Sequence, residues 1–167
     1  MNVIKYQKSL KLILFLSIFA LVSAYFIQYV LGHQPCNLCL FERVPYLSSI
    51  IIILSCFYFK KFEKISLILL SLIFFFATIL SFYHFGIEQG FIKESLVCNL
   101  SVGDNFINPE ELLKSLKEKP ISCKDVTFRL FGLSLATINI FISLIVSVIT
   151  LKLFLDYEKT NKNTVEE

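Results

Sequence analysis

Two pairs of cysteines are the residues of this sequence best suited to chemistry. Cys36 and Cys39 are separated by two residues, and Cys98 and Cys123 lie much farther along the chain. A CxxC pair has three common uses: half of a zinc site, a thioredoxin-like redox pair, or a structural bridge. The fifth cysteine, Cys56, falls inside an apolar stretch, where cysteine behaves as a small apolar residue, and we interpret it as structural.

Redox chemistry fits the CxxC spacing better than the other two uses. Zinc would need two more ligands, and although His33 could supply one, Cys98 and Cys123 are too far apart to form a second half-site. We therefore predict no metal site. A structural bridge across so short a loop removes little chain entropy and stabilises the fold little. In a redox pair, by contrast, the short ring makes the disulfide easily reduced, and one thiol can be held as a reactive thiolate.

The elements that must position these cysteines are membrane helices. Of the 167 residues, 56% are apolar, 17% are charged and none is Trp, which is more apolar than a soluble domain. Four apolar runs approach the roughly 20 residues that cross a bilayer as helix, namely 12–31, 44–59, 65–87 and 131–151. A net charge of +3, with no phosphate loop or basic-aromatic stripe, gives no sign of nucleic-acid binding. The sequence predicts an all-α, integral membrane four-helix bundle, as a single domain over residues 1–167.

Lysines near the apolar runs predict the orientation. They precede the first run, fill the turn between the second and third, and follow the fourth: Lys5, Lys8, Lys11, Lys60, Lys61, Lys64, Lys152, Lys159 and Lys162. Such residues are retained on the cytoplasmic side, so both termini are predicted to be cytoplasmic. The two outer loops, about 32–43 and 88–127, then each carry one cysteine pair on the side that is oxidising in bacteria.

Two further features of the chain bear on this topology. Val22-Ser23-Ala24 resembles a signal-peptidase site, but cleavage there would halve the bundle, and the apolar run continues beyond it. In the second outer loop, Asn108-Pro109-Glu110-Glu111 is typical of a helix start. We predict a short amphipathic helix there, lying either on the membrane surface or on the loop itself.

The topology indicates a relay between the two cysteine pairs. Cys36 and Cys39 lie between the first two spans, at membrane depth, whereas Cys98 and Cys123 lie in a long loop that we expect to be exposed. A purely structural disulfide remains open for the second pair, because closing its loop could contribute about 3–4 kcal/mol. Two pairs on one face of the membrane nevertheless suit successive disulfide exchange.

Three kinds of ionisable residue near the first pair could assist it. Arg43, one helical turn after Cys39, could lower a thiol pKa or stabilise a reduced acceptor. His84, near the outer end of the third span, could donate a hydrogen bond or a proton to an acceptor between helices. An interfacial arginine and an interfacial histidine with no role are the alternatives. Glu42 and Glu88 are expected to be solvated at the interface, without a chemical role.

These residues belong to a longer pattern. The string Pro35-Cys36-Asn37-Leu38-Cys39-Leu40-Phe41-Glu42-Arg43-Val44-Pro45-Tyr46 resembles the signature of the disulfide bond formation protein B (DsbB) family. Further similarities follow in order over most of the chain: Tyr83-His84, Gly86-Ile87-Glu88-Gln89-Gly90, Cys98, Cys123 and Phe131-Gly132-Leu133-Ser134-Leu135-Ala136. The twelve-residue string is far more specific than a bare CxxC.

The resemblance implies a multi-pass enzyme of the bacterial inner membrane. It would reoxidise a periplasmic thioredoxin-fold oxidase (DsbA-like) and pass the electrons to ubiquinone or menaquinone. The resemblance also implies that Cys98 forms a mixed disulfide with the reduced partner and that Cys123 passes reducing equivalents to Cys36. Cys39 would face the quinone, and Arg43 and His84 would help to bind it.

Departures from the family pattern and competing functions leave several points open. Phe128 and Ile138 stand at positions often filled by Trp, and the second outer loop has its own sequence, which leaves the partner undetermined. A non-catalytic scaffold with static outer disulfides and a metal-handling protein using His33, Cys36 and Cys39 are the alternatives from other classes. A vitamin-K-epoxide-reductase-like protein is disfavoured because its CxxC usually comes late in the bundle. The sequence indicates neither the quinone nor the resting pairing of the four outer cysteines.

Overall fold

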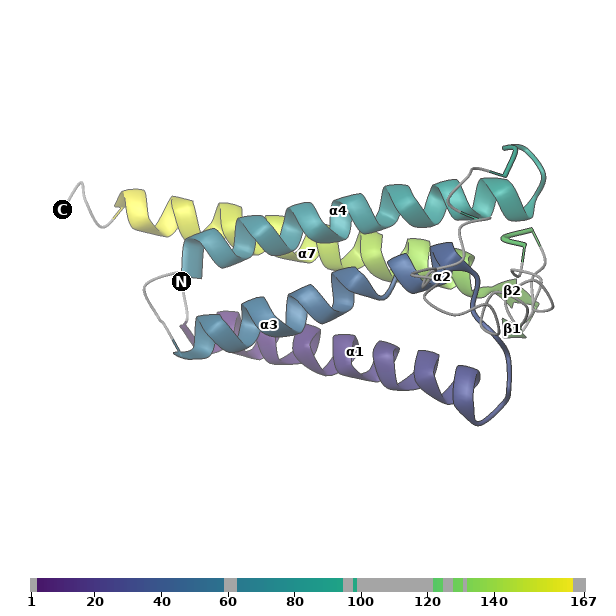
Figure 1. Ribbon diagram of the computed structural model, residues 1–167. Helices are drawn as coiled ribbons and strands as arrows, with labels where there is room; N and C mark the ends of the chain where they lie inside the picture. The colour runs from purple at the N-terminus through teal and green to yellow at the C-terminus, as the bar shows by residue number, and fades with distance from the viewer. Residues whose placement is uncertain are drawn as a thin grey trace, which may run out of the picture.

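Four long helices dominate the computed structural model, which describes residues 3–58, 63–94, 98, 122–124, 128–130 and 132–163 (Figure 1). They are α1 (Val3–Tyr29), α3 (Val44–Tyr58), α4 (Glu63–Glu88) and α7 (Leu135–Asn163). A short helix, α2 (Asn37–Phe41), leads into α3, and two short strands, β1 (Arg129–Leu130) and β2 (Leu133–Ser134), lead into α7.

Four helical segments in the described part of the chain are long and apolar enough to cross a membrane: Gln7–Tyr29, Asn37–Tyr58, Glu63–Glu88 and Leu135–Lys159. The predicted four-helix membrane architecture is thereby confirmed. The amphipathic helix predicted from Asn108 lies outside the described residues.

The long helices pack as two pairs that meet through α3 and α4. Helix α4 runs beside α7, helix α1 runs beside α3, and α3 also contacts α4 (Figure 1). The start of α1 and the end of α7 lie at one end of the bundle, whereas α2, β1 and β2 gather at the other (Figure 1). The start of the first helix and the end of the last thus share a side, opposite the short elements that flank the cysteines.

The inside and outside of the bundle are both apolar, as expected for a bilayer. All four long helices contribute to the core, for example through Leu10, Ile53, Phe74 and Val146. Many large apolar side chains also face outward: Phe15, Phe19, Leu54, Phe76, Phe82, Ile145 and Leu155 are among them. So much exposed apolar surface on a soluble protein would mark an interface, and on these helices it suits contact with lipid.

Serine hydroxyls join the helices of each pair. Ser49 on α3 donates to Ser17 Oγ on α1 at 2.8 Å, and Ser147 on α7 donates to the Ser71 carbonyl on α4 at 3.2 Å. Small polar residues of this kind let membrane helices approach closely and bond across the gap.

Helix α7 starts later than the apolar run predicted. The run was expected to be helical from residue 131, but β1 and β2 form an antiparallel pair in which Leu130 lies opposite Leu133. Gly132 has a φ of 84°, a left-handed conformation that glycine adopts without strain, and it lies in the turn between the strands. Ser134 then accepts a hydrogen bond from the Thr137 N–H at 3.2 Å, as an N-cap does, so the helix begins at Leu135.

Candidate redox site

Cys36 and Cys39 lie together at the start of α2. The Cys36 side chain caps the helix by accepting a hydrogen bond from the Cys39 N–H at 3.3 Å. The two Sγ atoms are 2.9 Å apart and hydrogen-bonded, and the two residues are free thiols. The CxxC spacing therefore brings both sulfurs to one face of the first helical turn, as a reduced pair poised to close into a disulfide.

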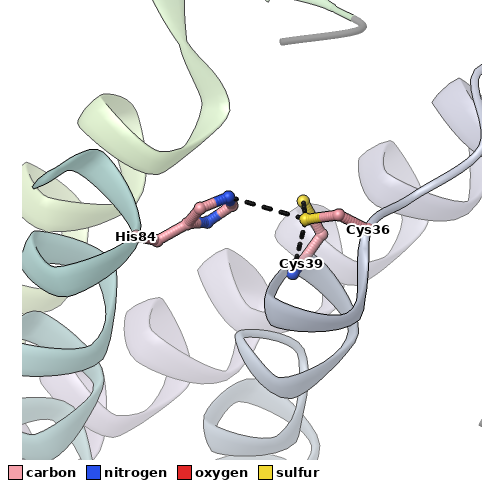
Figure 2. A group of neighbouring side chains, drawn as sticks. All are labelled: Cys36, Cys39 and His84. Atoms are coloured by element: carbon pink, nitrogen blue, oxygen red, sulfur yellow. Dashed lines mark hydrogen bonds between the residues drawn. The ribbon is translucent and has the colours of Figure 1, made fainter. Parts of the chain in front are cut away.

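His84 of α4 faces this pair, although it is 48 residues away in sequence (Figure 2). Its Nε2 atom lies 3.5 Å from Cys36 Sγ, and its side chain is only 2% exposed. The other ring nitrogen, Nδ1, lies 2.9 Å from Glu42 Oε1. A carboxylate that accepts from Nδ1–H fixes the ring and leaves Nε2 to exchange a proton with the sulfur.

Glu42 is buried, and the expectation that it is solvated at the interface is wrong. The residue is 8% exposed, and its second oxygen accepts a hydrogen bond from Asn139 Nδ2 on α7 at 3.1 Å. Asn139 also donates to Ser81 Oγ on α4 at 2.7 Å and accepts from the Tyr46 hydroxyl on α3. A polar network thus crosses three helices behind the sulfurs, which offsets the cost of burying the carboxylate.

Glu88 is also withdrawn from solvent, contrary to its predicted interfacial solvation. Its side chain is 6% exposed, and Oε1 lies 3.7 Å from His84 Nε2, one helical turn earlier on α4. Its other oxygen, Oε2, is buried without a hydrogen-bond partner among the described residues. Buried polar atoms are normally satisfied, so this oxygen needs an explanation.

These surroundings lower the pKa of the Cys36 thiol, which lies just outside the membrane-spanning segments. The side-chain hydrogen bond between Cys36 and Cys39 is the largest cause. Burial acts in the opposite direction, and the hydrogen bond and charge of His84 add to the lowering. Cys36 is therefore the better placed of the two sulfurs to act as a thiolate.

Arg43 is directed toward α1. Its guanidinium donates to Gln28 Oε1 at 2.7 Å and lies over the Tyr25 ring, 4.9 Å from the ring centroid. From the sequence we expected this cation one helical turn after Cys39, close to its sulfur. Its observed contacts are instead with α1, and they connect the turn between α2 and α3 to that helix. A planar guanidinium suits both contacts, because it can donate a hydrogen bond in its plane and stack its face on an aromatic ring.

Cys98 and Cys123 form a disulfide with a Cα–Cα distance of 5.7 Å. Both residues are buried, contrary to the exposed position expected for this loop. They belong to one apolar cluster with Cys36, Leu38 and Ile87, against which Cys39 also packs. All four cysteines that the sequence singled out therefore meet at one end of the bundle.

The two remaining candidates lie apart from this cluster. His33 contacts the Phe128 ring, with centroids 5.3 Å apart, so the nitrogen beside the sulfurs comes from His84 instead. Cys56 is buried in the main core of the bundle, with Ile53 and Leu67, and this agrees with a structural role.

Sequence reasoning missed Glu42, Glu88 and Asn139. A signal for each was present, because an ionisable or amide side chain in or beside an apolar span is costly and usually has a partner. Asn139 stands within the run 131–151, and both glutamates flank predicted spans. Their partners, however, lie on other helices and could not be read from sequence spacing.

Comparison with known proteins bears on the identity of this site. The family model for disulfide bond formation protein DsbB matches residues 7–153, a range that contains all four cysteines of the cluster. An uncharacterized protein of Rickettsia prowazekii (strain Madrid E), RP370, is 32% identical over 158 residues, which cover 93% of this chain and 91% of that protein. No solved structure matches. The chain is a multi-pass membrane protein that belongs to the DsbB family of disulfide bond formation proteins.

Proposed function

We propose that this protein is a thiol:quinone oxidoreductase. It would reoxidise a periplasmic DsbA-like thioredoxin-fold oxidase and pass the electrons through two cysteine pairs to ubiquinone or menaquinone. One observation carries the proposal: a single apolar cluster holds the Cys98–Cys123 disulfide beside Cys36 and Cys39, with His84 in contact with Cys36. Family membership supports thiol oxidoreductase chemistry in disulfide bond formation.

Electrons would enter at the Cys98–Cys123 disulfide. A thiolate of the reduced partner attacks Cys98 Sγ, the old sulfur–sulfur bond breaks, and Cys123 leaves as a thiolate. The second thiol of the partner then attacks its own mixed-disulfide sulfur and releases Cys98. The partner loses two electrons and two protons and becomes a disulfide. Because Cys98 is buried, docking of the partner must first expose it.

The second step would be an exchange between the two pairs of this chain. Starting from a Cys36–Cys39 disulfide, the Cys123 thiolate attacks Cys36 Sγ, and Cys39 leaves with the electron pair of the broken bond. Cys98 then attacks Cys123, which restores the Cys98–Cys123 disulfide and frees Cys36. This step ends with the second pair joined and the first pair reduced, the pattern that the cysteines have in the structure.

The last step would return Cys36 and Cys39 to a disulfide and release two electrons and two protons. A bound quinone supplies a sink for both. Several features of the site suit such a group. Cys39 is half-buried, the apolar Phe41 and Val44 that follow it in the chain are exposed, and His84 Nε2 lies 3.5 Å from Cys36 Sγ. Cys39 would face the carbonyl oxygens, and His84 Nε2 would pass to one of them the proton that it takes from a thiol. Arg43, which now donates to Gln28 Oε1, would have to turn from α1 to donate to the other. Glu42 would hold the His84 ring in place while its Nε2 takes the proton of a thiol.

This reaction needs a definite orientation, which stays a prediction. The cluster would face the periplasm of a bacterial inner membrane, with both termini in the cytoplasm. The lysines counted in the sequence support that orientation. It would place the disulfides in the oxidising compartment and within reach of a soluble partner.

The proposal is tested by turnover of the purified chain in lipid nanodiscs. Given a reduced DsbA-like oxidase and a soluble ubiquinone or menaquinone analogue, the protein should reduce the quinone while the partner becomes oxidised. Cys36→Ser should reduce the rate to background, whereas Cys56→Ser, a matched change in the main core, should leave it unchanged. Full turnover by Cys36→Ser, or none by the native chain with either quinone, would contradict the proposal.

Burial of the Cys98–Cys123 disulfide favours one competing function, a non-catalytic scaffold with static bridges. Redox titration separates the two functions. A static bridge should resist reduction by glutathione, whereas a relay should be reduced at more oxidising potentials.

A further inference from the structure

Three side chains at the redox site present metal-ligating atoms to one point. Cys36 Sγ, Cys39 Sγ and one His84 ring nitrogen all lie within 4.8 Å of one another (Figure 2). Sulfur and imidazole nitrogen are the ligands that Zn²⁺ prefers, and sites with two cysteines and one histidine are well known. From the sequence alone, the CxxC pair had no second zinc half-site at a suitable spacing. In the structure the nitrogen ligand comes from His84 on another helix, α4.

Glu88, one helical turn from His84, is the candidate fourth ligand, and its side chain would have to move toward the sulfurs, because its oxygens do not lie within 4.8 Å of all three of the other ligand atoms. Its Oε1 atom lies 3.7 Å from the Nε2 atom that also faces Cys36. Its Oε2 atom is buried without a hydrogen-bond partner among the described residues, in a side chain that is 6% exposed. A carboxylate withdrawn from water and left partly unsatisfied can be completed by a cation.

The far side of His84 is arranged as it is in metal-bound histidines. Such residues almost always give their other ring N–H to a carboxylate or carbonyl, which fixes the ring and raises its basicity. Glu42 does this for His84, with Oε1 2.9 Å from Nδ1, and Glu42 is itself held by Asn139 at 3.1 Å.

We propose that Cys36, Cys39, His84 and Glu88 form a tetrahedral binding site for a thiophilic divalent cation such as Zn²⁺, open only while the two cysteines are reduced. The sulfurs, now 2.9 Å apart, would move to about 3.8 Å, the separation set by two Zn–S bonds of about 2.3 Å at the tetrahedral angle. Binding forms two Zn–S bonds, and the protons that the two sulfurs and His84 Nε2 carry in the reduced site pass to solvent.

The site has a consequence for turnover that rests on the proposed function. A Cys36–Cys39 disulfide has no thiolate to offer, so oxidation excludes the cation. Conversely, a bound cation keeps both sulfurs from closing into a disulfide and keeps His84 Nε2 from taking a proton. Zinc should therefore inhibit the oxidoreductase reversibly, by trapping its reduced state.

Binding is tested with Zn²⁺ alone on the full chain in nanodiscs, in a Cys98→Ser/Cys123→Ser background that removes the other pair. After phosphine reduction and gel filtration, mass spectrometry of the metal should find one zinc per chain. After oxidation with diamide it should find none. In the reduced chain, Co²⁺ should give the absorption bands of tetrahedral thiolate coordination.

Variants identify the ligands. Cys36→Ser should abolish binding, and Glu88→Gln should weaken it about tenfold or more. Cys56→Ser is the matched cysteine control and should bind as before. Circular dichroism verifies that each variant is helical, and the cobalt bands of Glu88→Gln report on the folded site directly. Equal zinc content in the oxidised chain or in Cys36→Ser, or unchanged affinity in Glu88→Gln, would overturn the proposal.

The two proposals fail separately. A native chain that turns over but binds no zinc when reduced overturns the metal site and leaves the oxidoreductase standing. A chain that binds zinc in this pattern but never reduces quinone overturns the oxidoreductase and leaves the metal site standing. If both hold, zinc should inhibit turnover and a chelator should restore it.

Discussion

The two cysteine pairs share one apolar cluster but differ in what surrounds them. Cys36 lies against His84, which is backed by Glu42 and faced by Glu88. Beside the other pair the described bonds serve to hold the chain: Glu94 accepts from the Ser122 hydroxyl and, at 3.1 Å, from the Lys124 N–H on either side of Cys123. One pair is thus equipped to move protons, and the other is held in place for exchange.

The largest loss of turnover should come from removing one cysteine of the Cys98–Cys123 pair. Cys123→Ser leaves Cys98 as a lone thiol, so the disulfide that a thiolate of the reduced partner would attack is gone and turnover should fall to background. An oxidase variant that lacks its second cysteine, and whose remaining cysteine is activated as a mixed disulfide with thionitrobenzoate, should form a stable disulfide with Cys98 as the Cys98 thiolate displaces thionitrobenzoate; a non-reducing gel and mass spectrometry detect the product. Turnover at the native rate would show that the second pair is outside the electron path.

Cys36 should also differ from an ordinary thiol in how its rate of alkylation depends on pH. Because its surroundings lower the pKa of Cys36, this residue should remain a thiolate as the pH falls from about 8 to 6. An ordinary thiol loses roughly 100-fold in thiolate over that range. Alkylation of the reduced chain by a small reagent, followed by mass spectrometry, measures this for each site. The rate at Cys36 should be nearly constant, and a steep fall there would contradict the assigned role of its neighbours.

Glu42 should affect the rate of quinone reduction through its hydrogen bond to His84, because it does not itself contact the reacting sulfurs. Glu42→Gln removes the charge beside Nδ1 but keeps a hydrogen-bonding side chain, so quinone reduction should slow about 10- to 100-fold. A shift in the pH profile of kcat should accompany the loss, which a merely structural defect would not produce. Glu63→Gln, at the opposite end of α4, is the matched control. An unchanged rate and profile in Glu42→Gln would show that the carboxylate only packs.

The smallest expected effect concerns the network behind the site. Asn139→Ala would leave Glu42 Oε2, Ser81 and Tyr46 each without a bond that they now make, at a cost of about 1–3 kcal/mol. Unfolding in denaturing detergent should detect this. Ser55→Ala, which removes an intrahelical bond on an exposed face, should cost much less. Equal stability of the two variants would mean that the network contributes little.

Sequence by itself determined the membrane helices and the identity of the cysteines. Runs of apolar residues near 20 in length leave the backbone no alternative to helix in a bilayer, and CxxC spacing brings two sulfurs to one helical turn. These are local properties, fixed by residues adjacent in the chain. The start of α7 was misjudged because an apolar run does not reveal the Gly132 turn and the Ser134 cap inside it.

Tertiary structure alone decided which polar groups surround the sulfurs. His84 reaches Cys36 across 48 residues, and Asn139 reaches Glu42 across 97, because α4 and α7 pack beside the α2–α3 corner. Nothing in local spacing encodes those distances. The energetic cost of burying a carboxylate unpaired is why Glu42 had to find partners, but only the packing of the helices determined that they would be His84 and Asn139.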